Sequence, residues 1–208
     1  WAQAMAALTG PGAPFEIVER LVGGQPLRDF AALPKSMREA FALARLHGDK
    51  PFVVYEDETW TFADMMARVD EIADALVHRY GIRPGDRVAI AMRNYPEWIA
   101  SFAAILSVGG IAVCMNAWWK ADEMAYGLDD SGARLLIADV ERLEIARPRI
   151  ASGGLRALVV RHEGSLPTGV ERMQDVLRAG AAMPEVDVHS HQDATILYTS
   201  GTTGFPKG

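Results

Sequence analysis

Short apolar runs and helix-length segments alternate along most of this chain, and this alternation constrains the fold more than any other feature. Strands are expected at 88–92, 111–114, 134–137, 155–160 and 195–198. Helices are expected between them, at 95–108, 122–128, 140–150 and 170–178. Parallel strands need a crossover connection, which is usually a helix. The order therefore predicts an α/β fold: a largely parallel sheet with helices on both faces.

The segment ahead of this alternation predicts a helix, a hairpin and a second helix. Ser36 is placed to cap a helix over 37–46, and residues 52–60 contain a strand that returns through an acidic turn. Thr61 and Asp64 have the spacing of a capping box, and apolar residues follow at three- and four-residue intervals. An amphipathic helix is therefore expected to begin after Thr61 and to end near Tyr80.

The first 34 residues are rich in alanine, glycine and proline and contain only short apolar patches. We interpret residues 1–34 as a loose N-terminal leader with a short helix near 15–22. The other expected regions are an α/β subdomain over 35–192 and a strand with its following loop over 193–208, which begins the next subdomain.

The last eleven residues read YTSGTTGFPKG and combine glycines, hydroxyls and one lysine. Gly201, Gly204 and Gly208 permit backbone conformations closed to other residues, so main-chain N–H groups can converge on an anion. Lys207 adds a mobile positive charge suited to phosphate oxygens. The side-chain hydroxyls belong to Thr199, Ser200, Thr202 and Thr203. The stretch predicts a loop that binds a triphosphate.

This stretch has two other interpretations. The Walker pattern fails twice, because its second glycine would fall on Pro206 and its Ser or Thr after Lys207 is Gly208. A flexible Gly/Thr turn without function is the other alternative. The apolar run over 194–198 favours a buried strand that leads into a functional loop.

The whole string resembles the phosphate-binding signature of the AMP-forming adenylating enzymes. These are the acyl-CoA synthetases, firefly-luciferase-type enzymes and peptide-synthetase adenylation domains. Weaker landmarks of the same family follow in the same order over about 35–208, and Asn116-Ala117-Trp118-Trp119 favours the acyl-CoA synthetase branch. They are Trp60-Thr61-Phe62, Gly85-Asp86-Arg87-Val88, Asn94-Tyr95-Pro96-Glu97, Asp130-Ser131-Gly132-Ala133 and Asp193.

The resemblance implies an ATP-dependent carboxylate–CoA ligase, of which this chain is the N-terminal part of the large domain. In such enzymes a carboxylate attacks the α-phosphate of ATP, and a thiol, usually that of coenzyme A, then takes the acyl group. The resemblance implies that Lys207 contacts the terminal phosphates and that Thr199 faces Mg²⁺. It also implies that Ser200, Gly201, Thr202, Thr203 and Gly204 wrap the phosphates.

The resemblance places the catalytic lysine and the adenine and acyl pockets after Gly208. We therefore expect no synthetase turnover from these 208 residues alone, and the sequence leaves the acid, the thiol acceptor and homodimer formation open. Two alternative functions also stay open. One is a free-standing nucleotide-binding or interaction module that kept the loop, and the other is a different member of the family, such as an amino-acid adenylation domain.

Composition excludes several classes of protein. The net charge of −6 and the lack of any basic run argue against a nucleic-acid partner. A single cysteine, Cys114, and the lack of a signal pattern at the N-terminus favour a cytoplasmic protein. Residues 98–115 carry no charge, but Gly109-Gly110 divides them into a helix and a strand, so no transmembrane segment is expected.

Three groups of residues have spacing that could suggest other sites. His189 and His191 would suit a metal on a strand, but no third ligand lies nearby in sequence, so a solvated linker is expected. Trp118-Trp119 could stack on a ligand or anchor a subunit contact, although packing is the preferred interpretation. Asp129 and Asp130 are expected to point apart as surface charges.

Overall fold

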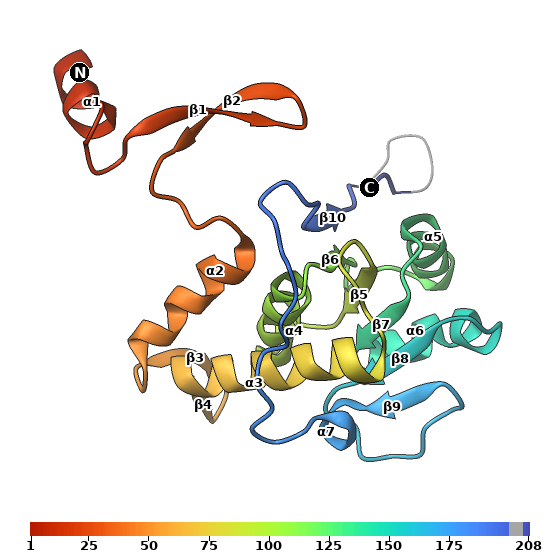
Figure 1. Ribbon diagram of the computed structural model, residues 1–208. Helices are drawn as coiled ribbons and strands as arrows, with labels where there is room; N and C mark the ends of the chain where they lie inside the picture. Colours follow the sequence, from red (N-terminus) through yellow and green to blue (C-terminus); the bar gives the residue numbers. More distant parts are fainter. Residues whose placement is uncertain (200–205) are drawn as a thin grey trace.

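The computed structural model describes residues 1–199 and 206–208, and a six-stranded sheet forms its centre (Figure 1). The strands lie in the order β10-β6-β5-β7-β8-β9, and each neighbouring pair is parallel. Their bounds are β5 Arg87–Ala91, β6 Ile111–Cys114, β7 Leu135–Ala138, β8 Arg156–Val159, β9 Val170–Arg172 and β10 Thr195–Leu197. The predicted α/β class is confirmed.

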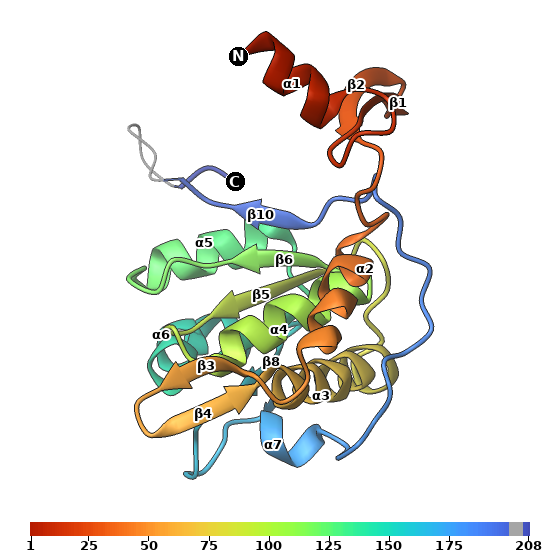
Figure 2. The same cartoon turned by 90° about the vertical axis from the view of Figure 1, so that its left-hand side faces the viewer.

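Helices cover both faces of the sheet, as Figure 2 shows. Successive side chains of a strand point to opposite faces, so Val88 and Ile90 pack on one side, while Ala89 and Ala91 pack on the other. The Val88 side is covered by α3 and α4, with α2 packed against α4. The Ala89 side is covered by α5 and α6. The bounds are α2 Met37–Ala42, α3 Phe62–Asp74, α4 Pro96–Ser107, α5 Ala121–Ser131 and α6 Val140–Ala151.

The uncharged stretch over 98–115 forms a buried helix and a buried strand, as predicted. Gly109, with φ of 72°, makes the turn between α4 and β6, and a side chain there would be strained. Within the described residues, no helix is both long and apolar enough to cross a bilayer.

The caps and the hairpin ahead of the sheet also agree with the sequence. The Ser36 hydroxyl accepts the Glu39 N–H at 3.2 Å, and Thr61 and Asp64 form the complete capping box. Strands β3 Pro51–Tyr55 and β4 Glu58–Thr61 form the expected hairpin. Two shorter helical turns, η1 Leu43–His47 and the π-type η2 Ala75–Arg79, extend the chain after α2 and α3.

The helix predicted near 15–22 is wrong. Those residues lie in strand β1 Ile17–Val22, which pairs antiparallel with β2 Gln25–Phe30, and a helix occurs earlier, at α1 Ala2–Thr9. Gly23 and Gly24 have φ of 58° and 81°, the positive angles that a two-residue hairpin turn requires. No residue of this region is buried, and it stands apart from the sheet in both views (Figures 1 and 2).

The helix predicted over 170–178 is mostly wrong. Residues 170–172 form β9, whose pairing with β8 places Val170 opposite Ala157, and only α7 Met173–Val176 is helical. The chain then returns to β10 without a helix or strand over 177–194. Arg178 fastens it to the buried carboxylate of Asp74 at 2.6 and 2.9 Å.

Glu171 on β9 joins the outer strand to the end of η2. Its carboxylate accepts hydrogen bonds from Arg79, from the Tyr80 hydroxyl at 2.8 Å and from Arg156 at 3.0 Å. These donors, Arg79 first, lower the pKa of Glu171 from 4.5 to about 2. A lowered carboxyl pKa adds stability above pH 4.5, and this contribution is lost as the pH falls towards 2.

Replacing Glu171 with glutamine is therefore expected to flatten the acid side of the stability profile. The melting temperature should fall less between pH 6 and pH 3 in Glu171→Gln than in the unchanged protein, because the variant has no carboxyl group to protonate there. Calorimetry at several pH values measures this difference. Equal slopes for the two proteins would contradict the role given to Glu171.

Candidate functional site

Strand β10 brings the chain to the side of the sheet at which all the parallel strands have their carboxyl ends. It pairs with β6 so that Leu197 lies opposite Cys114. The carboxyl ends of β10, β6 and β5 therefore point the same way, as the arrowheads in Figure 2 show. In open α/β sheets, ligands bind outside these ends. We call this side of the molecule the carboxyl edge.

Thr199 and Lys207, on either side of the residues that are not described, pair with each other, and we call this pair the neck. Thr199 and Lys207 make an antiparallel bridge: the Thr199 N–H donates to the Lys207 carbonyl at 2.8 Å, and the Lys207 N–H donates to the Thr199 carbonyl at 3.1 Å. The Thr199 hydroxyl lies 3.3 Å from the same Lys207 carbonyl. The structure thus brings together the first and last predicted site residues. Ser200, Gly201, Thr202, Thr203 and Gly204 lie outside the described residues.

Tyr198, directly before the neck, contacts α5. Its hydroxyl donates to a carboxylate oxygen of Asp130 at 2.6 Å, and its ring packs edge-on against Trp119 with centroids 5.4 Å apart. Asp129 and Asp130 have different partners, and Asp129 pairs with Arg149 at 2.5 Å. Asp130, however, is more than a surface charge. Tyr198 and Asp130 are 68 residues apart in the chain, so no local sequence pattern predicts this contact.

The loop after β6 holds two tryptophans in different settings. Trp119 is buried beside Tyr198, in agreement with the packing interpretation, while Trp118 is 73% exposed. The guanidinium of Arg93, after β5, lies 4.5 Å from the Trp118 ring centre. Trp119 therefore contacts Tyr198 beside the neck, and Trp118 contacts Arg93 at the end of β5.

A cavity of about 550 Å³ opens at these central ends. From β5 the chain runs first to β6 on one side and then to β7 on the other, so the strand order reverses there. Such a reversal is the preferred ligand position in doubly wound sheets. We call this cavity the switch-point cavity. It is lined by Tyr55, Arg93, Asn94, Tyr95, Ala117, Trp118 and Glu141. Sequence reasoning missed it, although two family landmarks contribute to its wall.

A buried ion pair fixes one wall of the switch-point cavity. Asp139 caps α6 by accepting the Arg142 N–H at 2.9 Å, and its other oxygen accepts the Arg93 N–H at 2.9 Å. The Arg142 guanidinium lies 3.1 Å from the same carboxylate, and both residues are only 4% exposed. Asp139 thus holds the loop after β5 against the start of α6.

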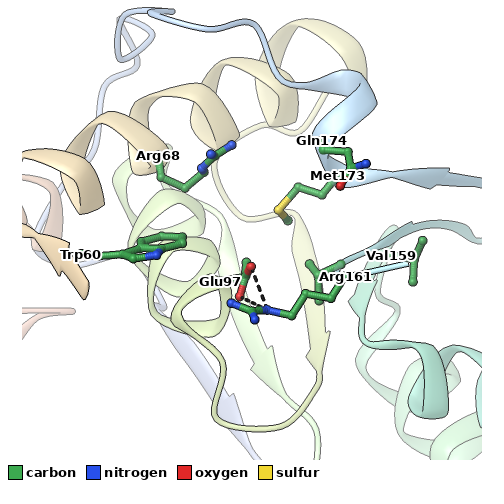
Figure 3. Close-up of a pocket in the computed structure, with 8 residues that line it drawn as sticks. Trp60, Arg68, Glu97, Val159, Arg161, Met173 and Gln174 are labelled. Carbon is green, nitrogen blue, oxygen red and sulfur yellow. Dashed lines mark hydrogen bonds and ion pairs between the residues drawn. The ribbon is translucent and has the colours of Figure 1, made fainter. Parts of the chain in front are cut away.

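A smaller cavity, shown in Figure 3, lies at the end of β8. Arg161 borders it and forms hydrogen bonds with Glu97 at 3.0 Å and with Glu58 at 2.7 and 3.0 Å. The hydrogen bond from Arg161 lowers the pKa of Glu58. The volume of about 140 Å³ is below that of typical ligand pockets, which begin near ~300 Å³. The cavity is therefore too small for a substrate site, and the ion pair between Arg161 and Glu58 at its border joins the β3-β4 hairpin to the end of β8.

Metal-ligating side chains are sparse in the described part of the chain. No group of three or more His, Cys, Asp and Glu side chains that could hold a metal occurs there. His189 lies 3.1 Å from the exposed carboxylate of Asp187. At the neck, the Thr199 hydroxyl is one hard oxygen, which suits Mg²⁺ only if phosphates or water supply the remaining ligands.

The comparisons with known proteins agree on one family. Residues 41–208 match the family described as AMP-binding enzyme. The chain is 31% identical over 172 residues to long-chain fatty acid transport protein 2 of Rattus norvegicus, covering 79% of this chain and 28% of that protein. It is also 31% identical over 157 residues to 2-succinylbenzoate–CoA ligase of Bacillus pumilus, covering 75% of this chain and 29% of that protein.

Among solved structures, the chain resembles an anthranilate CoA ligase in complex with anthranoyl-AMP. The TM-score is 0.76 at 27% identity, and the match covers 84% of this chain and 34% of that chain. The protein described here therefore spans about a third or less of the length of these relatives.

Proposed function

This chain belongs to the AMP-binding enzyme family, and from that premise we propose that it forms the N-terminal, phosphate-binding part of an ATP-dependent carboxylate–CoA ligase. The observation that carries this proposal is the closed neck of Thr199 and Lys207 at the carboxyl edge. The neck holds the ends of a Gly- and Thr-rich loop together beside a lysine, where a triphosphate can approach from solvent.

The work of these residues is to grip the leaving group. When a carboxylate oxygen attacks the α-phosphorus of ATP, the bond to the β-phosphate oxygen breaks and negative charge builds on the departing pyrophosphate. Main-chain N–H groups of the loop and the Lys207 ammonium stabilise that charge, while the neck orients it for in-line attack. The products are an acyl-adenylate and pyrophosphate, and a thiol then displaces AMP.

Mg²⁺ is proposed to arrive with ATP, because this ion keeps several waters and is bound mainly through substrate phosphates. The Thr199 hydroxyl would contribute one oxygen, and the ion would neutralise phosphate charge. The loop residues from Ser200 to Gly204 are proposed to wrap the same phosphates. The cytoplasmic location and the domain boundary near residue 193 stay predictions, while the acid and homodimer formation stay open.

Carboxylate-dependent exchange of labelled pyrophosphate into ATP tests the function in the protein that contains this chain. Exchange that requires an added carboxylic acid is the expected result, together with thioester formation once CoA is supplied. The 208 residues alone should show no exchange. ATP turnover without any carboxylate, or exchange by the 208 residues alone, would contradict the assignment. Transfer to a carrier-protein thiol in place of CoA would favour the amino-acid adenylation alternative.

The switch-point cavity is proposed to receive the nucleotide part of the thiol co-substrate. Trp118 exposes an aromatic face on which an adenine ring can stack, and Arg93 offers a positive charge to a phosphate. Trp118→Ala is expected to raise the KM for CoA about tenfold, because base stacking on an aromatic ring contributes ~1–3 kcal/mol. The KM for ATP should be unchanged.

Steady-state kinetics with CoA as the varied substrate measures this effect. Trp1→Ala is the matched control, since Trp1 is 97% exposed and the N-terminus lies far from β10 in Figure 1. An unchanged KM for CoA in Trp118→Ala would remove the cavity from the thiol half-reaction.

A further inference from the structure

Tyr198, the residue before the neck, forms a side-chain hydrogen bond with Asp130 on helix α5. Its hydroxyl donates to Asp130 Oδ2 at 2.6 Å and lies 3.4 Å from the Gly127 carbonyl oxygen. The distance to Asp130 is that of a charge-assisted hydrogen bond, roughly twice as strong as a neutral one. Burial, and then Asp130, raise the pKa of Tyr198, so the hydroxyl remains a donor at neutral pH.

Two glycines leave room for the neighbouring rings of Trp119 and Tyr198. A Cβ atom on Gly127 would lie 2.6 Å from the Trp119 ring, and one on Gly208 would lie 2.8 Å from the Tyr198 ring. These distances are shorter than real Cβ contacts, so larger side chains would displace the rings. Tyr198 therefore precedes one end of the loop in the chain and touches Gly208 just beyond the other.

The neck needs such a fastening because its other supports are few. Strand β10 has three residues and one neighbouring strand, and Thr199 and Lys207 are joined by an isolated bridge. Short edge pairings open with low free-energy cost. A side-chain tether to a helix that is packed on the sheet reduces the motion of the neck, and with it the motion of Lys207.

Resting on the proposed function, we propose that Asp130 is a positioning residue for the phosphate loop. It accepts the Tyr198 hydroxyl and so holds the neck at the orientation in which Lys207 meets the terminal phosphates of ATP. Asp130 does not touch the substrate in this assignment.

Kinetics of the protein that contains this chain test the assignment. Asp130→Ala and Tyr198→Phe are each expected to raise the KM for ATP about tenfold, the effect of losing one hydrogen bond to a charged group. The KM for the carboxylic acid should change less than about twofold. In its KM for ATP the double variant should be no worse than either single variant, because both remove the contact between Tyr198 and Asp130. Asp130→Ala also removes the longer hydrogen bond from the Tyr126 hydroxyl at 3.4 Å, which does not involve the neck. A purely structural defect would instead lower the folded fraction and the apparent kcat, with both KM values unchanged.

Two further variants make the test specific. Asp130→Asn keeps an acceptor for the hydroxyl and should restore the KM for ATP to within about threefold of the starting value. Asp129→Ala is the matched control, because Asp129 is adjacent in sequence but pairs with Arg149. An unchanged KM for ATP in both Asp130→Ala and Tyr198→Phe would overturn the positioning role. If the unsubstituted protein shows no carboxylate-dependent exchange, the proposed function itself fails, and this outcome is distinguishable from the first.

Discussion

Replacing Lys207 with methionine is expected to lower the kcat of adenylate formation by roughly 100-fold, the cost of removing one preorganised group that stabilises transition-state charge. Methionine keeps most of the length of the side chain and removes the ammonium. The neck should remain closed, because it depends on the main chain of Lys207. Pyrophosphate exchange at saturating carboxylate measures the loss.

Lys50→Met is the matched control for this substitution, since Lys50 is exposed beside the β3-β4 hairpin. It removes the same charge from the protein and should leave the exchange rate within about twofold, as expected for a surface substitution. Wild-type exchange by Lys207→Met would show that the ammonium does not act on the leaving group.

Replacing Asp139 with alanine is expected to destabilise the protein by about 3–5 kcal/mol, the usual cost of breaking a buried ion pair. The substitution removes the buried carboxylate that faces the Arg142 guanidinium and leaves only the exposed carboxylate of Glu141, 2.7 Å away; it also uncaps α6 and frees the Arg93 N–H. A chain of this size loses ~2–4 °C of melting temperature per kcal/mol, so a fall of at least about 6 °C should follow.

Calorimetry measures this fall, with Glu144→Ala as the control. Glu144 also forms an ion pair with an arginine three residues away on the same helix, but both side chains of this pair are more than half exposed. Exposed pairs contribute about 0–1 kcal/mol, so the control should melt within a few degrees of the unchanged protein. Equal melting temperatures for the two variants would show that the Asp139 pair is not important for stability.

Much of the sheet could be predicted because its signals are local. Residues 111–114 are a short apolar run that contains the β-branched Ile111 and Val113 and follows a double glycine, and β6 has those bounds. Thr61 and Asp64 satisfy each other within one helical turn, so their capping box needs no tertiary partner. Elements of this kind follow from periodicity and capping alone.

The wrong helix predictions arise where the same sequence pattern fits both a helix and a strand. The apolar residues near 15–22 fit a short helix as well as a strand, and the Gly23-Gly24 turn decided for the hairpin. Residues 170–172 became a strand because β8 offered an unpaired edge, which no local signal reports. At 170–172 a partner strand that is not adjacent in the local pattern overrode the local preference, whereas at 15–22 the deciding turn lies directly after the pattern.

The candidate site divides in the same way. The loop motif is contiguous, so its residues and their chemistry could be read directly from the last eleven positions. The contact between Asp130 and Tyr198 and the switch-point cavity both depend on the order of strands in the sheet. That order cannot be deduced from the spacing of residues in one chain, because several arrangements satisfy the same alternation.

Protection of Lys207 from amine labelling tests the central claim most directly. The chain has four lysines, Lys35, Lys50, Lys120 and Lys207, so mass spectrometry after brief acylation can follow each of them. If the neck presents Lys207 to the terminal phosphates, MgATP or pyrophosphate should slow labelling of Lys207 in the protein that contains this chain and leave the other three unchanged. Equal labelling of Lys207 with and without saturating MgATP would contradict the account.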